Sequence, residues 1–426
     1  MVSNVVNDQA FGAEQAVSTP PADDGQLRRA VRATYIAFAA SGFAFANWAA
    51  RIPQVRQHFQ LQPSALGLVL LAIATGSVIS LPLSGPLIAW LGPRRAVSIT
   101  AALLSAGLVI VATGYLVGLA TVVAGLFVFG LSTGVWDVAM NIHGGVVERR
   151  LGRSILPRFH AGWSVGTVGG AIVGAVAVAV HLPVTAHLVG VAVLVALVVP
   201  RAASQFLPDV SQPEENARPG DAEQEEQGRT AHRTVLRAWL EPRTLVIGAF
   251  VLAFAFAEGT ANDWTSLAAI DGYHLQAAVG TLVFATFLAA MTIGRWFSPI
   301  FLDRFGRVPV ARSSGLIAIA GVALFVFGPV VLCAFAGALL WGTGTAVGFP
   351  LGMSAGGDEP DLAAGRVSVI ASIGYCAFLA GPPLVGFLAD QLTILRALIS
   401  VAVLLAVALV LAPAVRPLRA PDPKAG

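Results

Sequence analysis

The sequence predicts an all-α polytopic membrane protein, with twelve transmembrane helices arranged as two pseudo-symmetric six-helix bundles. Hydrophobic residues make up 56% of the 426-residue chain and charged residues only 12%, whereas soluble domains carry about 25% charged residues. The apolar residues also gather in stretches of about 20, the length that a helix needs to cross about 30 Å of hydrocarbon. A soluble domain is therefore excluded, and the small net charge of +3 gives no reason to expect a nucleic-acid partner.

Six expected spans lie in the first half of the chain. Residues 1–27 are polar and lack a basic region followed by an apolar core, so we expect a disordered cytoplasmic tail and not a signal peptide. The N-terminal bundle then occupies residues 28–206. Its expected spans are 31–50, 64–90, 96–117, 119–147, 159–180 and 183–205.

A polar segment divides the two bundles. Residues 207–243 are rich in Glu, Gln, Pro and Arg and cannot bury apolar area, which predicts a cytoplasmic linker. The C-terminal bundle is expected at residues 244–415, followed by a cytoplasmic tail at 416–426. Its expected spans are 244–270, 276–302, 309–327, 329–353, 365–389 and 392–415.

The basic residues predict how the chain is oriented, because cytoplasmic loops carry an excess of Lys and Arg. With these spans, only Arg51, Arg56 and Arg396 fall on the outer side. The basic clusters on the other side are 28–32, 94–95, 149–158, 201–243, 304–312, 366 and 416–424. We therefore expect a bacterial inner-membrane protein with both termini in the cytoplasm.

The two halves resemble one another in the order of their motifs. Asn47-Trp48 at the end of the first span is echoed by Asn262-Asp263-Trp264 in the seventh. Such a duplication is typical of transporters built from internal repeats.

The loop after the eighth span carries a family resemblance. Residues 303–307 read Asp-Arg-Phe-Gly-Arg and resemble the signature loop of the major facilitator superfamily. The first-half copy keeps its glycines but has Ala89 and Trp90 in place of the Asp-Arg pair, which puts the usual first-half charge gate in doubt. The resemblance covers residues 28–415 and implies two bundles that alternate the exposure of a central solute site.

Charges in these two loops are expected to act as a conformational latch, pairing in one state and parting in the other. The alternative is that they enforce topology by positive charge alone. The residues concerned are Arg94, Arg95, Asp303, Arg304 and Arg307.

A narrower resemblance lies in the fourth and fifth spans. Asp137-x-x-x-Asn141, the Arg-rich segment 148–158 and Ser164-x-Gly166 are similar to fucose-permease-type sugar/proton symporters and YbjJ-like bacterial permeases. In the fucose permeases an acid on the fourth helix takes part in proton-coupled sugar recognition, and Asp137 occupies the matching position. The Gly-Pro antiporter signature of the fifth helix is absent, which disfavours a drug/proton antiporter of the common type.

Asp137 is the first candidate for proton coupling. An ionised carboxylate deep in hydrocarbon costs at least about 2.5–3.5 kcal/mol, so it is expected to face a protein interior or a wet cavity. Asn141 lies four residues later, on the same helical face, and is expected to bind the solute or Asp137. The alternative for Asp137 is a structural ion pair or a helix–helix hydrogen bond.

The seventh span repeats this spacing of acid and amide. Glu258 is the second proton-coupling candidate, and Asn262 and Trp264 are expected to contact the solute. Asp263 lies nearer the outer surface, where it is either a further functional acid or a solvated helix end.

Other polar and aromatic residues also allow either a functional or a structural interpretation. Asn47 and Trp48 offer an amide and an indole face for a polar ring such as a sugar, although a Trp there is also an ordinary interface anchor. Tyr375 is expected to contact the solute, with plain packing as the alternative. His160 is expected to be structural rather than a proton relay, and Arg295 to pair with an acid or with carbonyl groups.

These observations predict a secondary active transporter that moves a small polar solute, such as a sugar, with proton coupling and without a cofactor, metal or catalytic site. No Walker-type Gly-Lys-Ser/Thr loop is present, so an ion gradient is expected to supply the energy. The alternative is proton-driven efflux of a drug or an amphipathic metabolite. The expected partners are the solute, protons and the lipid bilayer, around a monomer that is not an enzyme.

Overall fold

The computed structural model describes residues 24–152, 155–207 and 237–418. Most of the expected tails at 1–27 and 416–426, and most of the expected linker at 207–243, lie outside these residues. So does Arg153 of the Arg-rich segment. Residues 24–27 are described, and they are helical where a disordered tail was expected.

The described residues form the twelve expected crossings. Ten helices are long and apolar enough to span a membrane. One of them, α3 (Pro63–Val117), contains Gly92 with a φ of 75°, a backbone conformation that glycine adopts readily, so two spans meet there. The 26-residue α1 (Asp24–Ala49) supplies the remaining crossing. The predicted all-α class is confirmed.

The first group of helices comprises α1 to α6. Besides α1 and α3, its members are α2 (Ile52–Phe59), α4 (Leu119–Leu151), α5 (Leu156–Ala179) and α6 (Val184–Ala203). Helix α2 was not expected, because the residues between the first two spans read as a loop.

The second group comprises α8 to α15. Its members are α8 (Pro242–Tyr273), α9 (Ala277–Phe305), α10 (Arg307–Phe327), α11 (Val331–Thr345), α12 (Gly348–Gly356), α13 (Pro360–Gln391), α14 (Ile394–Ala397), α15 (Ile399–Leu411) and the 3₁₀ turn Ala412–Val415. Helices α11 and α12 share one span, and α14 and α15 share the last one with the 3₁₀ turn.

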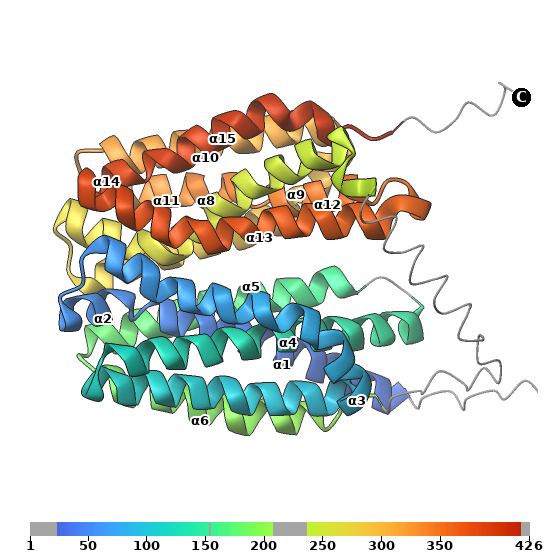
Figure 1. Ribbon diagram of the computed structural model, residues 1–426, viewed down its shortest axis with the longest axis horizontal. Coiled ribbons are helices and arrows are strands. Elements are labelled where there is room, and N and C mark those ends of the chain that lie inside the picture. Colours follow the sequence, from blue (N-terminus) through green and yellow to red (C-terminus); the bar gives the residue numbers. More distant parts are fainter. Residues whose placement is uncertain (1–23, 153–154, 208–236, 419–426) are drawn as a thin grey trace, which may run out of the picture.

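The two groups lie side by side with their helices roughly aligned (Figure 1). Helices α1 and α8 begin, and α15 ends, at one end of the molecule, which we term the linker end. Helices α2 and α14 lie at the opposite end, which we term the loop end.

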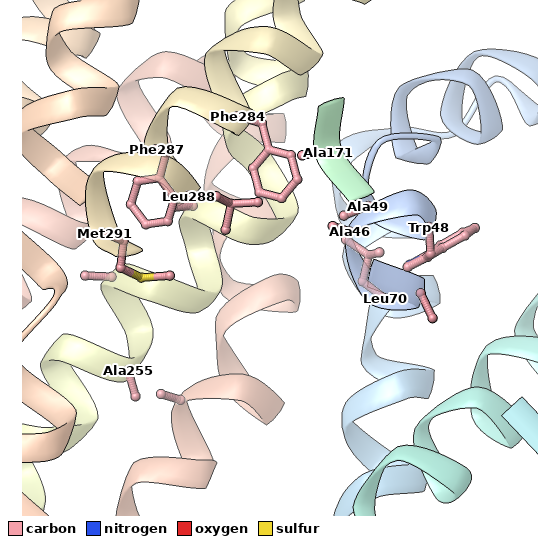
Figure 2. Close-up of a cluster of buried hydrophobic side chains, with 14 of the residues drawn as sticks. Ala46, Trp48, Ala49, Leu70, Ala171, Ala255, Phe284, Phe287, Leu288 and Met291 are labelled. Atoms are coloured by element: carbon pink, nitrogen blue, oxygen red, sulfur yellow. The ribbon is translucent and has the colours of Figure 1, made fainter. Parts of the chain in front are cut away.

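Most contacts between the groups run along two helix pairs, α3 with α13 and α5 with α9. A Cβ on Gly67 of α3 would collide with the carbonyl oxygen of Pro382 in α13, so the two backbones touch directly there. Small residues permit such close approach of helices in membranes. On the other side, Figure 2 shows Ala171 of α5 beside Phe284 of α9.

Candidate functional site

Asp137 and Asn141 form a hydrogen-bonded pair on α4. The Asn141 amide donates to the Asp137 carbonyl oxygen at 2.8 Å and to Asp137 Oδ1 at 3.3 Å. Asp137 is half-buried, and within the described part of the chain no Arg, Lys or His forms an ion pair with it. The predicted contact between this acid and this amide is therefore present, and the carboxylate lacks a fixed counter-charge.

Tyr375 reaches the same region from the other group of helices. It lies in the middle of α13, close enough to Asp137 for the two groups to interact electrostatically. Two residues predicted separately, one on each half of the chain, therefore lie near one another between α4 and α13.

Glu258 is paired with Arg295. Arg295 Nη2 lies 2.6 Å from Glu258 Oε2, which joins α9 to α8. Arg295 Nε also donates to the Ala346 carbonyl oxygen at 3.2 Å. The prediction that Arg295 pairs with an acid or with carbonyl groups is confirmed, since it does both.

One residue of the first group of helices, His160, lies near this pair. It lies on α5, within electrostatic range of Arg295 on α9. Its ring also packs edge-on against Phe38, with centroids 5.1 Å apart. The region between the groups thus contains an acid–amide pair, an acid–Arg pair and a His.

The polar segment of α8 holds several atoms that lack a partner. Asn262 Oδ1 and Trp264 Nε1 are buried without a hydrogen bond to the described residues, as are the hydroxyls of Thr260, Thr265 and Ser266. Buried polar atoms in proteins are almost always satisfied by protein, water or ligand. These atoms are accordingly available to water or a solute, and the solute contacts of Asn262 and Trp264 stay predictions.

Asn47 and Trp48 lie inside the first group. Both side chains are buried, and the Asn47 amide donates to the Phe43 carbonyl oxygen at 2.8 Å. Asn47 Oδ1 is 2.8 Å from His187 Nε2. In this conformation the polar atoms of Asn47 are therefore occupied by protein, and its contact with a solute stays a prediction.

His187 connects this amide to Arg51, which directly follows the first span and is buried. Arg51 Nε donates to His187 Nδ1 at 2.8 Å, and Arg51 Nη2 donates to the Leu182 carbonyl oxygen at 3.0 Å. Because Nδ1 accepts a hydrogen bond, Nε2 of a neutral His187 carries the proton and donates to Asn47. A His within an apolar span was the available signal, and it was not used.

Of the predicted latch residues, Arg307 forms an ion pair. Arg307 pairs with Asp358 at 2.7 Å and donates to Ser354 Oγ at 3.1 Å, both within the second group. Arg243 holds the other oxygen of Asp358 at 3.1 Å. The latch residues that lie exposed are Arg94, Arg95, Asp303 and Arg304.

A second ion-pair cluster at the linker end was missed by sequence reasoning. Arg366 donates to both carboxylate oxygens of Glu241, at 2.6 and 2.7 Å, and lies 3.2 Å from Glu359. Burial raises the pKa of the Glu241 carboxyl, but hydrogen bonds from Arg366 and Thr244 and the charges of Arg366 and Arg243 hold it below its ordinary value. The cluster fastens the start of α8 to the start of α13.

Comparison with known proteins identifies curated relatives over most of the chain. An uncharacterized transporter of Sinorhizobium fredii, y4wD, is 30% identical over 381 residues, which cover 89% of this chain and 96% of the relative. An uncharacterized MFS-type transporter of Yersinia pestis is 30% identical over 379 residues, covering 87% and 92%. The membrane protein MosC of Rhizobium meliloti is 25% identical over 372 residues, covering 87% and 86%.

Solved structures share the fold at low sequence identity. The nucleoside transporter NupG superposes with a TM-score of 0.68 at 16% identity, covering 90% of this chain and 98% of that one. A bacterial homologue of the lysosomal transporter Spinster, in an inward-facing and unoccupied conformation, gives 0.68 at 13% identity, covering 92% and 98%. A single-residue variant of the E. coli fucose:proton symporter FucP gives 0.59 at 16% identity, covering 90% and 98%.

The family model described as "Major Facilitator Superfamily" matches residues 34–376. This match covers most of the helices in both groups, including the signature loop at 303–307. The chain is therefore a multi-pass membrane transporter that belongs to the Major Facilitator Superfamily.

Proposed function

We propose that the chain is a proton-coupled secondary transporter of a small polar solute, with the solute bound between the two groups of helices and exposed to each side of the membrane in turn. The sugar class is the solute class that the sequence resemblance favours.

The observation that carries the proposal is the isolation of Asp137. This carboxylate lies within a membrane-spanning helix, where an unpaired acid is costly unless it has a use. Its hydrogen-bond partner is the neutral Asn141, at 3.3 Å. Because no fixed cation among the described residues holds it, the carboxylate can take up and release a proton without breaking an ion pair.

Glu258 supports a second, different role in coupling. Its carboxylate is bound to Arg295 at 2.6 Å, so protonation of Glu258 would weaken this pair. Charge changes at one such pair can bias two discrete arrangements of helices. In this proposal Asp137 takes up and releases the transported proton. A change in the charge of Glu258 alters its pairing with Arg295, and so the arrangement of α8 and α9.

The polar groups around these acids suit a neutral, hydroxyl-bearing solute. Asn141 and Tyr375 lie on different groups of helices, and Asn262 Oδ1 is a buried acceptor without a partner in the described residues. Amide and phenol groups both donate and accept hydrogen bonds, as a polyhydroxy solute requires. The proteins that share this fold include one named as a nucleoside transporter and one named as a fucose:proton symporter.

The contacts between the groups favour a conformation that faces the linker end. Arg56 pairs with Asp271, and the Ser64 backbone N–H donates to Asp390 Oδ1 at 3.4 Å, both at the loop end. The latch residue Arg304 is exposed and lies at the linker end. Since basic residues place the linker end in the cytoplasm, we propose an inward-facing state.

The test is solute flux in proteoliposomes under an imposed pH gradient. Purified protein is assayed against a panel of labelled sugars, polyols, nucleosides and amphipathic drugs, beside Asp137→Asn and the control Asp24→Asn, an exposed acid at the start of α1. The proposal expects gradient-driven accumulation of at least one polar solute by wild type and control, and its loss in Asp137→Asn. Flux that does not respond to the gradient would remove the coupling proposal, and transport of drugs alone would favour efflux.

A further inference from the structure

The tenth span contains a break that its own sequence creates. Helix α11 ends at Thr345 and α12 begins at Gly348. Pro350 lies four residues after Ala346, and because proline has no N–H it cannot donate to the Ala346 carbonyl group, which its ring also crowds. A carbonyl group in the middle of a membrane span is thus left without its usual helical donor.

Arg295 supplies the missing donor. Its Nε donates to the Ala346 carbonyl oxygen at 3.2 Å, while its Nη2 lies 2.6 Å from Glu258 Oε2. One side chain of α9 therefore joins the break in the tenth span to an acid in the seventh. The guanidinium group suits this task because its donors point in fixed and different directions.

Helices α8 and α9 pack closely against the backbone around the break. A Cβ on Gly294, the residue before Arg295, would lie 2.8 Å from the Ala346 Cβ, so α9 approaches the break directly. A Cβ on Gly348 would collide with the Phe254 ring of α8. Any change in the bend of the tenth span must therefore change its contacts with α8 and α9.

Thr345 contributes a second local distortion. Its hydroxyl donates to the carbonyl oxygens of Trp341 at 3.0 Å and Gly342 at 3.2 Å. Such bonding of a Thr side chain back to its own helix bends helices. Thr345 and Pro350 therefore both favour a break in the helix, and Arg295 binds the Ala346 carbonyl group that lies between them.

We infer that Arg295 is a positioning residue that fixes the bend of the tenth span, and that its pairing with Glu258 holds it in place to do so. Loss of the Glu258 charge then loosens the hydrogen bond to Ala346 and lets the tenth span change its bend. This inference rests on the proposed role of Glu258 in proton coupling, which it extends from the acid to a moving helix.

Few charges of the second group act on this pair. Helices α11, α12 and α15 carry no Asp, Glu, Lys, Arg or His. Helix α8 carries Asp263, which lies five residues after Glu258 and so more than one helical turn away. Helix α13 has Tyr375 and Cys376 in the middle of its span.

The remaining charged residues of the second group lie at the linker end or the loop end, and the other charges belong to the first group of helices. Arg366 of α13 is bound to Glu241 at the linker end. From the first group, His160 lies within electrostatic range of Arg295. A change in the charge of Glu258 is therefore the main electrostatic change that acts on Arg295.

Hydrogen–deuterium exchange of the full-length purified protein tests the inference. In Arg295→Met, amides of residues 343–353 should exchange about five- to tenfold faster, the factor expected for loss of one or two hydrogen bonds. Glu258→Gln should raise the exchange by a smaller factor of about two to three, since a neutral amide holds Arg295 less firmly. Arg312→Met, at an exposed Arg of α10 that has no predicted role, is the matched control and should match wild type.

A second substitution separates the hydrogen bond from the charge. Pro350→Ala restores a backbone N–H that can donate to Ala346, so exchange in Arg295→Met/Pro350→Ala should return to within about twofold of Pro350→Ala alone. Arg295→Lys keeps the ion pair but lacks the fork of donors, and should raise the exchange even if Arg295→Met does not fold.

Three outcomes would overturn the inference: unchanged exchange in both Arg295 variants, no rescue by Pro350→Ala, or unchanged exchange in Glu258→Gln. Failure of the proposed function is a separate result, because it would appear as wild-type flux that ignores the pH gradient. The exchange measurement needs no solute and is independent of that result.

Discussion

Arg56 in α2 forms an ion pair with Asp271 near the end of α8, and this pair connects the two groups of helices at the loop end. The side chains are 22% and 35% exposed, so solvent screens the pair in part. The Ser64 N–H to Asp390 hydrogen bond, at 3.4 Å, is a second link at the same end. Opening this end requires both links to part.

Arg56→Gln should therefore shift the conformational equilibrium towards opening of the loop end. Partly exposed ion pairs contribute about 0.2–1 kcal/mol, which corresponds to a shift of up to about fivefold. Spin labels at Gln57 and Gln391, in a protein without Cys333 and Cys376, would report the population by their distance distribution.

Arg396→Gln is the control, since Arg396 is an exposed Arg at the same end. The double variant Arg56→Asp/Asp271→Arg should restore the wild-type distribution. If Arg56→Gln and Arg396→Gln gave the same distances, the pair would have no part in holding this end closed.

His187→Ala should destabilise the first group of helices by about 2–3 kcal/mol, because it leaves the buried Arg51 Nε and Asn47 Oδ1 without their hydrogen-bond partner. Arg51 is 2% exposed, so water cannot replace the lost bond without disturbing the packing. The measurement is the apparent Tm of the purified protein in detergent.

His181→Asn provides a matched control at the same end of the molecule. His181 is exposed and has a φ of 55°, a conformation that Asn tolerates. An equal Tm for His187→Ala and His181→Asn would show that the His187 network does not stabilise the fold.

Glu241→Gln should destabilise the linker end at neutral pH and have no effect in acid. The folded pKa of Glu241 lies below its ordinary value of 4.5, so its stabilising contribution is complete above 4.5 and is lost as pH falls through the folded pKa. Loss of the charge-assisted bonds to Arg366 should cost about 1–3 kcal/mol.

Apparent Tm values of wild type and Glu241→Gln, recorded from pH 7 downwards, check this prediction. The two curves should converge as the carboxyl of the wild type becomes protonated. A Tm difference that stays constant with pH would mean that the ionised form of Glu241 contributes nothing.

Sequence reasoning succeeded where the signal is local. Each crossing is a run of apolar residues, and the hydrogen bond between Asn141 and Asp137 follows from a spacing of one helical turn. The partners of Arg295 could be stated as a class, an acid or a carbonyl group, because a buried guanidinium group must be satisfied. Which acid and which carbonyl group could not be read from the chain.

What could not be predicted depends on contacts between distant parts of the chain. Tyr375 lies within electrostatic range of Asp137, and Arg51 bonds to His187, only because helices far apart in sequence pack together. Arg51 was predicted to lie just beyond the first span, but its burial against His187 and a carbonyl group was not predicted. Helix α2 was read as a loop, since eight residues are too few to show a clear apolar period.

The central claim is that Asp137 and Glu258 couple solute movement to protons. The most direct measurement compares two fluxes of one solute in proteoliposomes, accumulation driven by a pH gradient and exchange without a gradient, for wild type, Asp137→Asn and Glu258→Gln. Proton coupling predicts that both variants lose accumulation by about tenfold for each pH unit of gradient, since one coupled proton supplies about 1.4 kcal/mol per unit, while exchange persists. Wild-type accumulation in both variants would contradict the claim.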